Sequence, residues 1–182
     1  RARLEEVPLH EVGLGARFAV GSFRVETIGM THSIPEPNAL LIDTPAGAIL
    51  HTGDWKLDPS PVIGETFDRR RLQTLGREPL LAMVCDSTNA VVPGHTASES
   101  SLFDPLKAIA NEAPGRLIVT TFASNVARLV TLARVAAATG RRFGVVGQAM
   151  QRMVGVAQAV GYWPDELPRL VPERGLGYLP RE

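Results

Sequence analysis

Two segments of the chain carry side chains that suit metal chemistry. Segment 30–35 contains His32, and segment 50–59 contains Gly53 followed by Asp54. Imidazole and carboxylate groups bind Zn²⁺ or Mn²⁺, and a carboxylate can bridge two ions. Gly53 allows a close approach of the backbone before Asp54. A plain tight turn at Gly53-Asp54 explains the same residues, so both interpretations stand at this stage.

Two further segments have polar residues suited to binding phosphate. Asp86 and the hydroxyl and amide side chains after it follow an apolar run, and they suit hydrogen bonds to a phosphate or to a neighbouring histidine. An Asx turn is the alternative for Asp86. Ser124 precedes a helical pattern, where free backbone amides attract an anion. Simple N-capping by Ser124 is the alternative.

The remaining histidines and the cysteine do not add a local motif. The four histidines, His10, His32, His51 and His95, form no H-x-H or H-E-x-x-H pattern. The single cysteine, Cys85, lies in an apolar run and is interpreted as a buried thiol. One cysteine excludes an internal disulfide framework and is typical of a reducing cytoplasm.

The spacing of apolar residues predicts the elements that position these side chains. In the first half, strands are expected at 18–20, 23–28, 39–43, 48–52 and 80–85, with a helix within 66–78. Each candidate segment then lies just beyond a strand, where a rigid strand can hold a loop residue in place.

The second half has an alternating rhythm. Thr96 and Glu99 have capping-box spacing ahead of a helix, and further helices are expected from Ser124 to Gly140 and up to about residue 160. Strands are expected at 117–121 and 143–146. This alternation predicts a parallel sheet.

The composition is that of a globular protein: 45% of residues are hydrophobic and 21% charged. Lys and Arg total 19, as do Asp and Glu, so any polyanion site has to be local. No apolar run is long enough to cross a bilayer. Arg69-Arg70-Arg71, Arg141-Arg142 and Arg152 are phosphate candidates, although most such arginines are solvated helix faces.

Taken together and in this order, four short motifs resemble the ribonuclease J family of β-CASP nucleases in the metallo-β-lactamase superfamily. The motifs are T-H-S-I-P (31–35), T-G-D-W-K-L-D (52–58), D-S-T-N-A (86–90) and T-F-A-S-N (121–125). The resemblance implies an α/β fold with part of a metallo-β-lactamase αββα sandwich in residues 1–95. It also implies part of a β-CASP domain, with a parallel α/β sheet, in residues 96–182.

The resemblance also implies roles for individual residues. His32 would bind one of two divalent ions, Zn or Mn, and Asp54 would bridge both. Asp86 would be an acidic residue near the catalytic centre. Ser124 and Asn125 would face the RNA backbone. The family's H-x-H-x-D-H ligand cluster is absent here and is expected upstream of Arg1, and two later histidine motifs are expected beyond Glu182.

The expected function is metal-dependent hydrolysis of RNA, with 5′-to-3′ exonuclease and endonuclease activity, in a cytoplasmic dimer or tetramer. This chain would carry only part of the site. A non-catalytic RNA-binding or scaffolding module is one alternative. A metallo-β-lactamase-fold hydrolase of a small ester or lactam is another, although the D-S-T-N-A segment and the α/β half argue against it.

Overall fold

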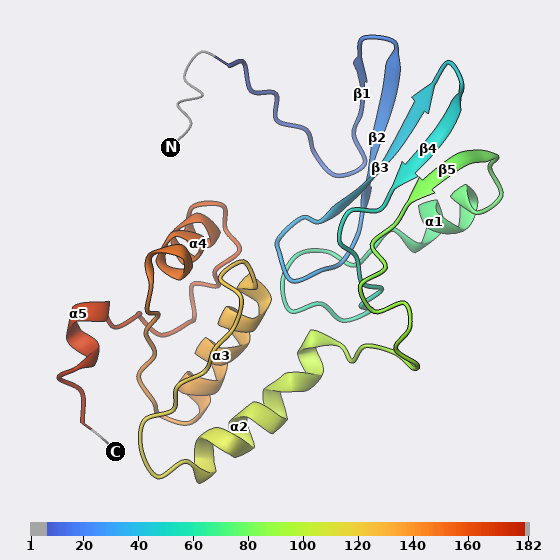
Figure 1. Cartoon of the computed structure of the whole chain (residues 1–182). Helices are drawn as coiled ribbons and strands as arrows, with labels where there is room; N and C mark the ends of the chain where they lie inside the picture. The colour runs from blue at the N-terminus through green and yellow to red at the C-terminus, as the bar shows by residue number, and fades with distance from the viewer. Residues whose placement is uncertain (1–6, 181–182) are drawn as a thin grey trace.

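The first half of the chain forms one sheet and the second half forms a group of helices, as a computed structural model of residues 7–180 shows (Figure 1). The five strands are β1 (Arg17–Val20), β2 (Phe23–Gly29), β3 (Asn38–Thr44), β4 (Gly47–His51) and β5 (Leu80–Val84), and they lie in that order across the sheet. The first four pair antiparallel, whereas β5 runs parallel to β4. All five predicted strands are confirmed.

Helix α1 (Arg69–Leu75) connects β4 to β5 and covers part of the sheet. Its Leu75 is 2% exposed and packs with residues of β2, β3 and β4, namely Ile28, Ala39, Leu41 and Leu50. Arg71 of α1 donates hydrogen bonds to both carboxylate oxygens of Glu26 in β2, at 2.8 and 2.9 Å, and so links the helix to the sheet. Of the expected αββα sandwich, the described residues therefore supply one sheet and one helix of that half.

The second half is built around one buried helix. Its elements are the 3-10 turn η1 (Glu99–Leu102) and the helices α2 (Phe103–Glu112), α3 (Val126–Ala138), α4 (Gln148–Ala159) and α5 (Glu173–Leu176). Val126 and Val130 of α3 are both 0% exposed, and they pack with Val154 of α4 and with Trp163. Val62 and Ile63, from the loop after β4, pack against the same cluster. The two halves therefore share apolar contacts.

The parallel sheet expected in the second half is not formed by the described residues. Segments 117–121 and 143–146 belong to no strand, and Ile118 and Val146 are 88% and 61% exposed. Their β-branched residues favour an extended backbone. A strand also needs a neighbour for its ladder hydrogen bonds, and no described segment lies against either one as a strand.

The start of this half also differs from the expected capping box. Ser98, and not Thr96, is the N-cap residue of η1, and it makes no capping hydrogen bond with its side chain. The Glu99 carboxylate binds Arg128 of α3 instead. The Glu99 carboxylate, which the local pattern predicted to cap a helix, thus forms a tertiary ion pair instead. Between residues 7 and 180, no helix combines the length and apolar character that crossing a membrane requires.

Candidate active site

The segments that carry His32 and Asp54 lie side by side at one end of the sheet. The amide of Lys56 donates to the carbonyl of Thr31 at 2.8 Å, and the two residues form an isolated antiparallel bridge. The Thr31 hydroxyl donates to the carbonyl of Lys56 and accepts from the amide of Asp58 at 2.9 Å. Thr31 is 2% exposed. The loops after β2 and β4 are therefore joined immediately beside His32.

His32 is half-buried and lines two cavities. Its Nδ1 lies 3.2 Å from the hydroxyl of Ser33, which leaves Nε2 as the ring nitrogen available to a ligand. A cavity of about 380 Å³ reaches His32 from the side of Glu36 and Asp68. A smaller one of about 80 Å³ lies between His32 and the start of α3. His32 thus lines a cavity of the first half and a smaller one that residues of both halves form.

Asp54 is exposed and follows a glycine whose conformation other residues rarely adopt. Gly53 has φ of 59°, and a side-chain Cβ there would lie 3.0 Å from the carbonyl oxygen of Asn38. The Gly53 amide also donates to Nδ1 of His51 at 3.1 Å. The expected close backbone approach at Gly53 is therefore observed, and His51 supports the same turn.

Asp86 sits just beyond β5 and forms the Asx turn, whereas hydrogen bonding of its carboxylate to a phosphate or a histidine stays a prediction. Its Oδ1 accepts from the Thr88 amide at 3.0 Å and from the Thr88 hydroxyl at 2.6 Å, which is an Asx turn. These bonds hold the pKa of Asp86 below its ordinary value, and the nearby charge of His32 contributes to the lowering. The Asp86 carbonyl accepts from the Trp55 indole at 3.2 Å. Asp86 thus adjoins the segment of Asp54, which the bond from Lys56 to Thr31 joins to the segment of His32.

The first turn of α3 faces His32 from the other half. The amide of Ala127 donates to the carbonyl of Ser33 at 3.3 Å. Asn125, and not Ser124, is the N-cap residue, since its side chain accepts from the Arg128 amide at 2.9 Å. Ser124 is exposed at the same helix end. The structure therefore brings Ser124 and Asn125 toward the segment of His32.

The donor types fit a divalent metal, but their number does not. Imidazole and carboxylate are ordinary ligands of such ions, and each ion takes about four or more ligands. Among residues 7–180, no group of three or more His, Cys, Asp or Glu side chains could hold a metal ion. His32 and Asp54 can therefore belong only to a larger ligand set.

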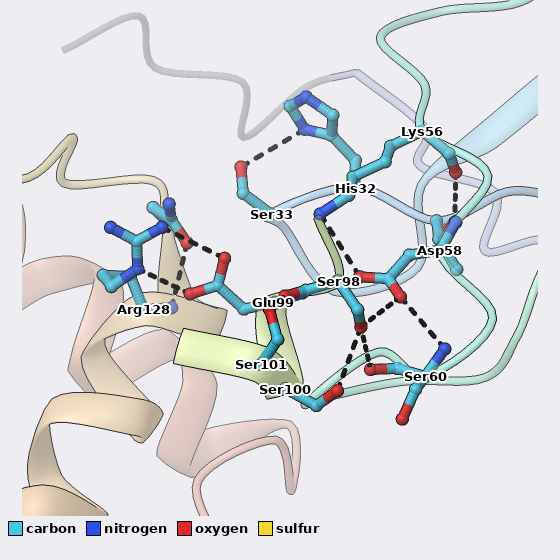
Figure 2. Close-up of polar contacts among 12 residues, drawn as sticks. His32, Ser33, Lys56, Asp58, Ser60, Ser98, Glu99, Ser100, Ser101 and Arg128 are labelled. Carbon is cyan, nitrogen blue, oxygen red and sulfur yellow. Dashed lines mark hydrogen bonds and ion pairs between the residues drawn. The ribbon is translucent and has the colours of Figure 1, made fainter. Parts of the chain in front are cut away.

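Asp58, the second aspartate of T-G-D-W-K-L-D, has a structural role that its sequence motif did not predict. Asp58 is 3% exposed and is the centre of a polar cluster drawn in Figure 2. Its carboxylate accepts from the Ser98 hydroxyl at 2.5 Å, from the Glu99 amide at 3.0 Å and from the Ser60 amide at 2.9 Å. The ammonium of Lys56 lies 3.3 Å away. Only its place within a short polar motif set Asp58 apart in the sequence.

Two of the arginines considered for phosphate binding have intramolecular partners. Arg71 binds Glu26 and Glu78. Arg141 donates to the carbonyls of Gly115 and Ala113, beyond the end of α2, at 2.7 and 2.6 Å. These two side chains therefore stabilise the fold.

Comparison with known proteins agrees with this arrangement. A crystal structure of a protein of unknown function from Enterococcus faecalis V583 shares the fold, with a TM-score of 0.54 and 21% identity over 91% of this chain and 40% of that one. The family model of the ribonuclease J β-CASP domain matches residues 114–182. Residues 114–182 thus belong to a β-CASP domain of the metallo-β-lactamase superfamily.

Curated relatives extend the match over most of the chain. Ribonuclease J of Sinorhizobium meliloti is 44% identical over 97% of this chain and 31% of its own length. Ribonuclease J of Synechocystis sp. is 42% identical over 87% of this chain and 25% of its own length. Ribonuclease J of Thermus thermophilus is 37% identical over 89% of this chain and 30% of its own length. The chain belongs to the ribonuclease J family, and it spans about a third or less of these relatives' length.

Proposed function

We propose that the protein carrying this chain is a metal-dependent ribonuclease that hydrolyses RNA phosphodiesters. Membership in the ribonuclease J family supports the reaction class. The observation that carries the proposal is the convergence of three strand ends: the loop of Asp54 bonds to Thr31, the residue before His32, and through Trp55 to the carbonyl of Asp86. Residues 1–95 would be the metallo-β-lactamase part and residues 96–182 the β-CASP part.

Two divalent cations, Zn or Mn, are the proposed cofactors of the complete protein. His32 would bind one ion, and Asp54 would bridge both. The described residues complete neither coordination sphere, so further ligands are needed. Such a pair of ions, when bound, would activate a water and clamp the scissile phosphate.

The other residues of the site would orient the reacting groups. Ser33 is placed to fix the His32 ring through Nδ1, as ligand histidines usually require. Asp86 stays ionised because its pKa is lowered, and its negative charge would favour the cationic centre. Ser124 and the amides at the start of α3 would receive a phosphate of the RNA backbone.

The substrate of the complete protein would be RNA, and the protein would assemble from several copies of one chain. RNA carrying a 5′-monophosphate would be degraded from 5′ to 3′, with endonuclease cuts as well, by a cytoplasmic homo-oligomer. The test is incubation of the full-length protein with labelled 5′-monophosphorylated RNA and Mn²⁺ or Zn²⁺. Release of mononucleotides that stops on chelation is expected. RNA binding without any cleavage, and with less than about one metal ion per chain, would support a non-catalytic RNA-binding module instead.

A further inference from the structure

A buried carboxylate joins the two halves of the chain. Asp58 lies in the loop after β4, and both of its oxygens accept hydrogen bonds from the start of η1 (Figure 2). Oδ1 accepts from the Ser98 hydroxyl at 2.5 Å, and Oδ2 accepts from the Glu99 amide at 3.0 Å. A charge that is 3% exposed is stable only when its hydrogen bonds are made. The contact with η1 is therefore needed to keep this carboxylate buried.

The same residue also fixes the loop on which it lies. Oδ1 accepts from the Ser60 amide at 2.9 Å, and Oδ2 lies 3.3 Å from the Lys56 ammonium. The Asp58 amide donates to the hydroxyl of Thr31, the residue before His32, at 2.9 Å. Asp58 thus contacts the His32 segment through its amide and the helical half through its carboxylate.

From η1 the contacts continue to α3. The Glu99 carboxylate binds Arg128 of α3 at 2.6 and 3.2 Å. The Ala127 amide then reaches the Ser33 carbonyl at 3.3 Å, which closes a ring of contacts around the smaller cavity. That cavity is lined by residues of both halves, His32 and Asp58 on one side and Glu99 and Ala127 on the other.

We propose that Asp58 is a positioning residue that sets the place of the α3 N-terminus relative to His32 and Asp54. This inference rests on the proposed function, in which an RNA strand contacts both. RNA hydrolysis then depends on the distance between the halves, because the strand has to meet the metal ligands and the α3 terminus at once. A phosphodiester too short to span the halves does not depend on it.

The test compares two substrates in the full-length protein. Asp58→Asn keeps the shape of the side chain and removes its charge. For RNA, kcat/KM is expected to fall about tenfold, since a small misplacement of a bound substrate has effects of this size or larger. For bis(p-nitrophenyl) phosphate, it is expected to stay within about twofold of the unmodified protein, because this compound needs only the metal centre.

A matched control separates this role from a general loss of stability. Asp43→Asn removes an aspartate of β3, whose partner Arg24 is 82% exposed, and both activities are expected to stay within about twofold. Ser98→Ala removes one donor to Asp58 and should lower only RNA hydrolysis, so it serves if Asp58→Asn does not fold. Equal losses on both substrates, or no loss on RNA, would overturn the proposal.

Hydrogen exchange gives a readout that is independent of activity. In Asp58→Asn, the amides of Glu99 and Ala127 should exchange at least about tenfold faster, because their contacts between the halves are loosened. If the unmodified protein does not cleave RNA, the proposed function fails and the exchange rates still decide the role of Asp58. Unchanged exchange at both amides would contradict that role.

Discussion

The Glu99 carboxylate is held by the Arg128 guanidinium through two hydrogen bonds, 2.6 Å from Nε to Oε1 and 3.2 Å from Nη2 to Oε2. The two side chains are only 13% and 30% exposed. Arg128→Lys keeps the charge and loses the paired geometry. The free energy of unfolding is expected to fall by about 1–2 kcal/mol in urea titrations, the range for a hydrogen bond to a charged group.

Arg134→Lys is the control on the same helix. Arg134 lies 3.8 Å from Glu166, and that carboxylate side chain is 71% exposed. Exposed pairs of this kind contribute little, so a change below about 0.5 kcal/mol is expected. Equal losses of unfolding free energy in the two variants would show that the Glu99–Arg128 pair contributes no more to stability than the exposed pair.

Capping of α3 is assigned to Asn125, whose side chain accepts from the Arg128 amide at 2.9 Å. Asn125→Ala should therefore lower the free energy of unfolding by about 1 kcal/mol. Ser124→Ala should leave it nearly unchanged, because Ser124 is exposed and is not the cap. Urea titration of both variants measures the difference. A larger loss in Ser124→Ala would restore the cap first expected from the sequence.

The turn before Asp54 depends on glycine for two separate reasons. Gly53 and Gly64 have similar positive φ angles of 59° and 71°. A methyl group added at Gly53 would lie 3.0 Å from the Asn38 carbonyl oxygen. A methyl group added at Gly64 would meet only a ring carbon of Tyr162, at 3.9 Å. Each alanine pays about 1–2 kcal/mol for the left-handed backbone. Gly53→Ala should lose more stability than Gly64→Ala by thermal melting, and it should also reduce RNA cleavage. Equal melting temperatures would contradict the close approach.

The contribution of Asp58 to stability should depend on pH. Burial raises the pKa of Asp58, but hydrogen bonds from Ser98, Glu99 and Ser60 and the charge of Lys56 outweigh burial, so the pKa lies below its ordinary value of 3.8. A lowered carboxyl pKa stabilises the fold at pH values above the ordinary pKa. This stabilisation is lost as the pH falls through the lowered pKa. The stability difference between the unmodified protein and Asp58→Asn should be constant from about pH 7 to about pH 5 and shrink below about pH 4. Urea titration at each pH measures it, and a difference that grows in acid would contradict this account.

Local patterns were enough to predict most of the elements. The strands expected at 18–20 and 23–28 pair as neighbours, and so do those expected at 39–43 and 48–52, because apolar stretches of strand length lie close together in the chain. Helices α3 and α4 follow from apolar spacing and end just before Gly140 and Gly161. The order of short motifs pointed to the family that the relatives then showed.

Contacts between distant residues were not predictable in this way. Asp58 and Ser98 are separated by 40 positions, and nothing local to either indicates the other. The competition between Ser124 and Asn125 for the cap depends on backbone geometry that both residue types allow. Segment 117–121 has the composition of a strand, but pairing depends on a neighbour that composition does not specify.

The most direct test of the account is the effect of Asp54→Ala on the full-length protein. RNA cleavage and bound metal are measured together, beside Asp43→Asn as the control. We expect Asp54→Ala to keep the fold, lose bound metal and cleave RNA at less than about a hundredth of the unmodified rate. Cleavage above about a tenth of that rate, with metal content unchanged, would contradict the assignment of Asp54 to the metal site.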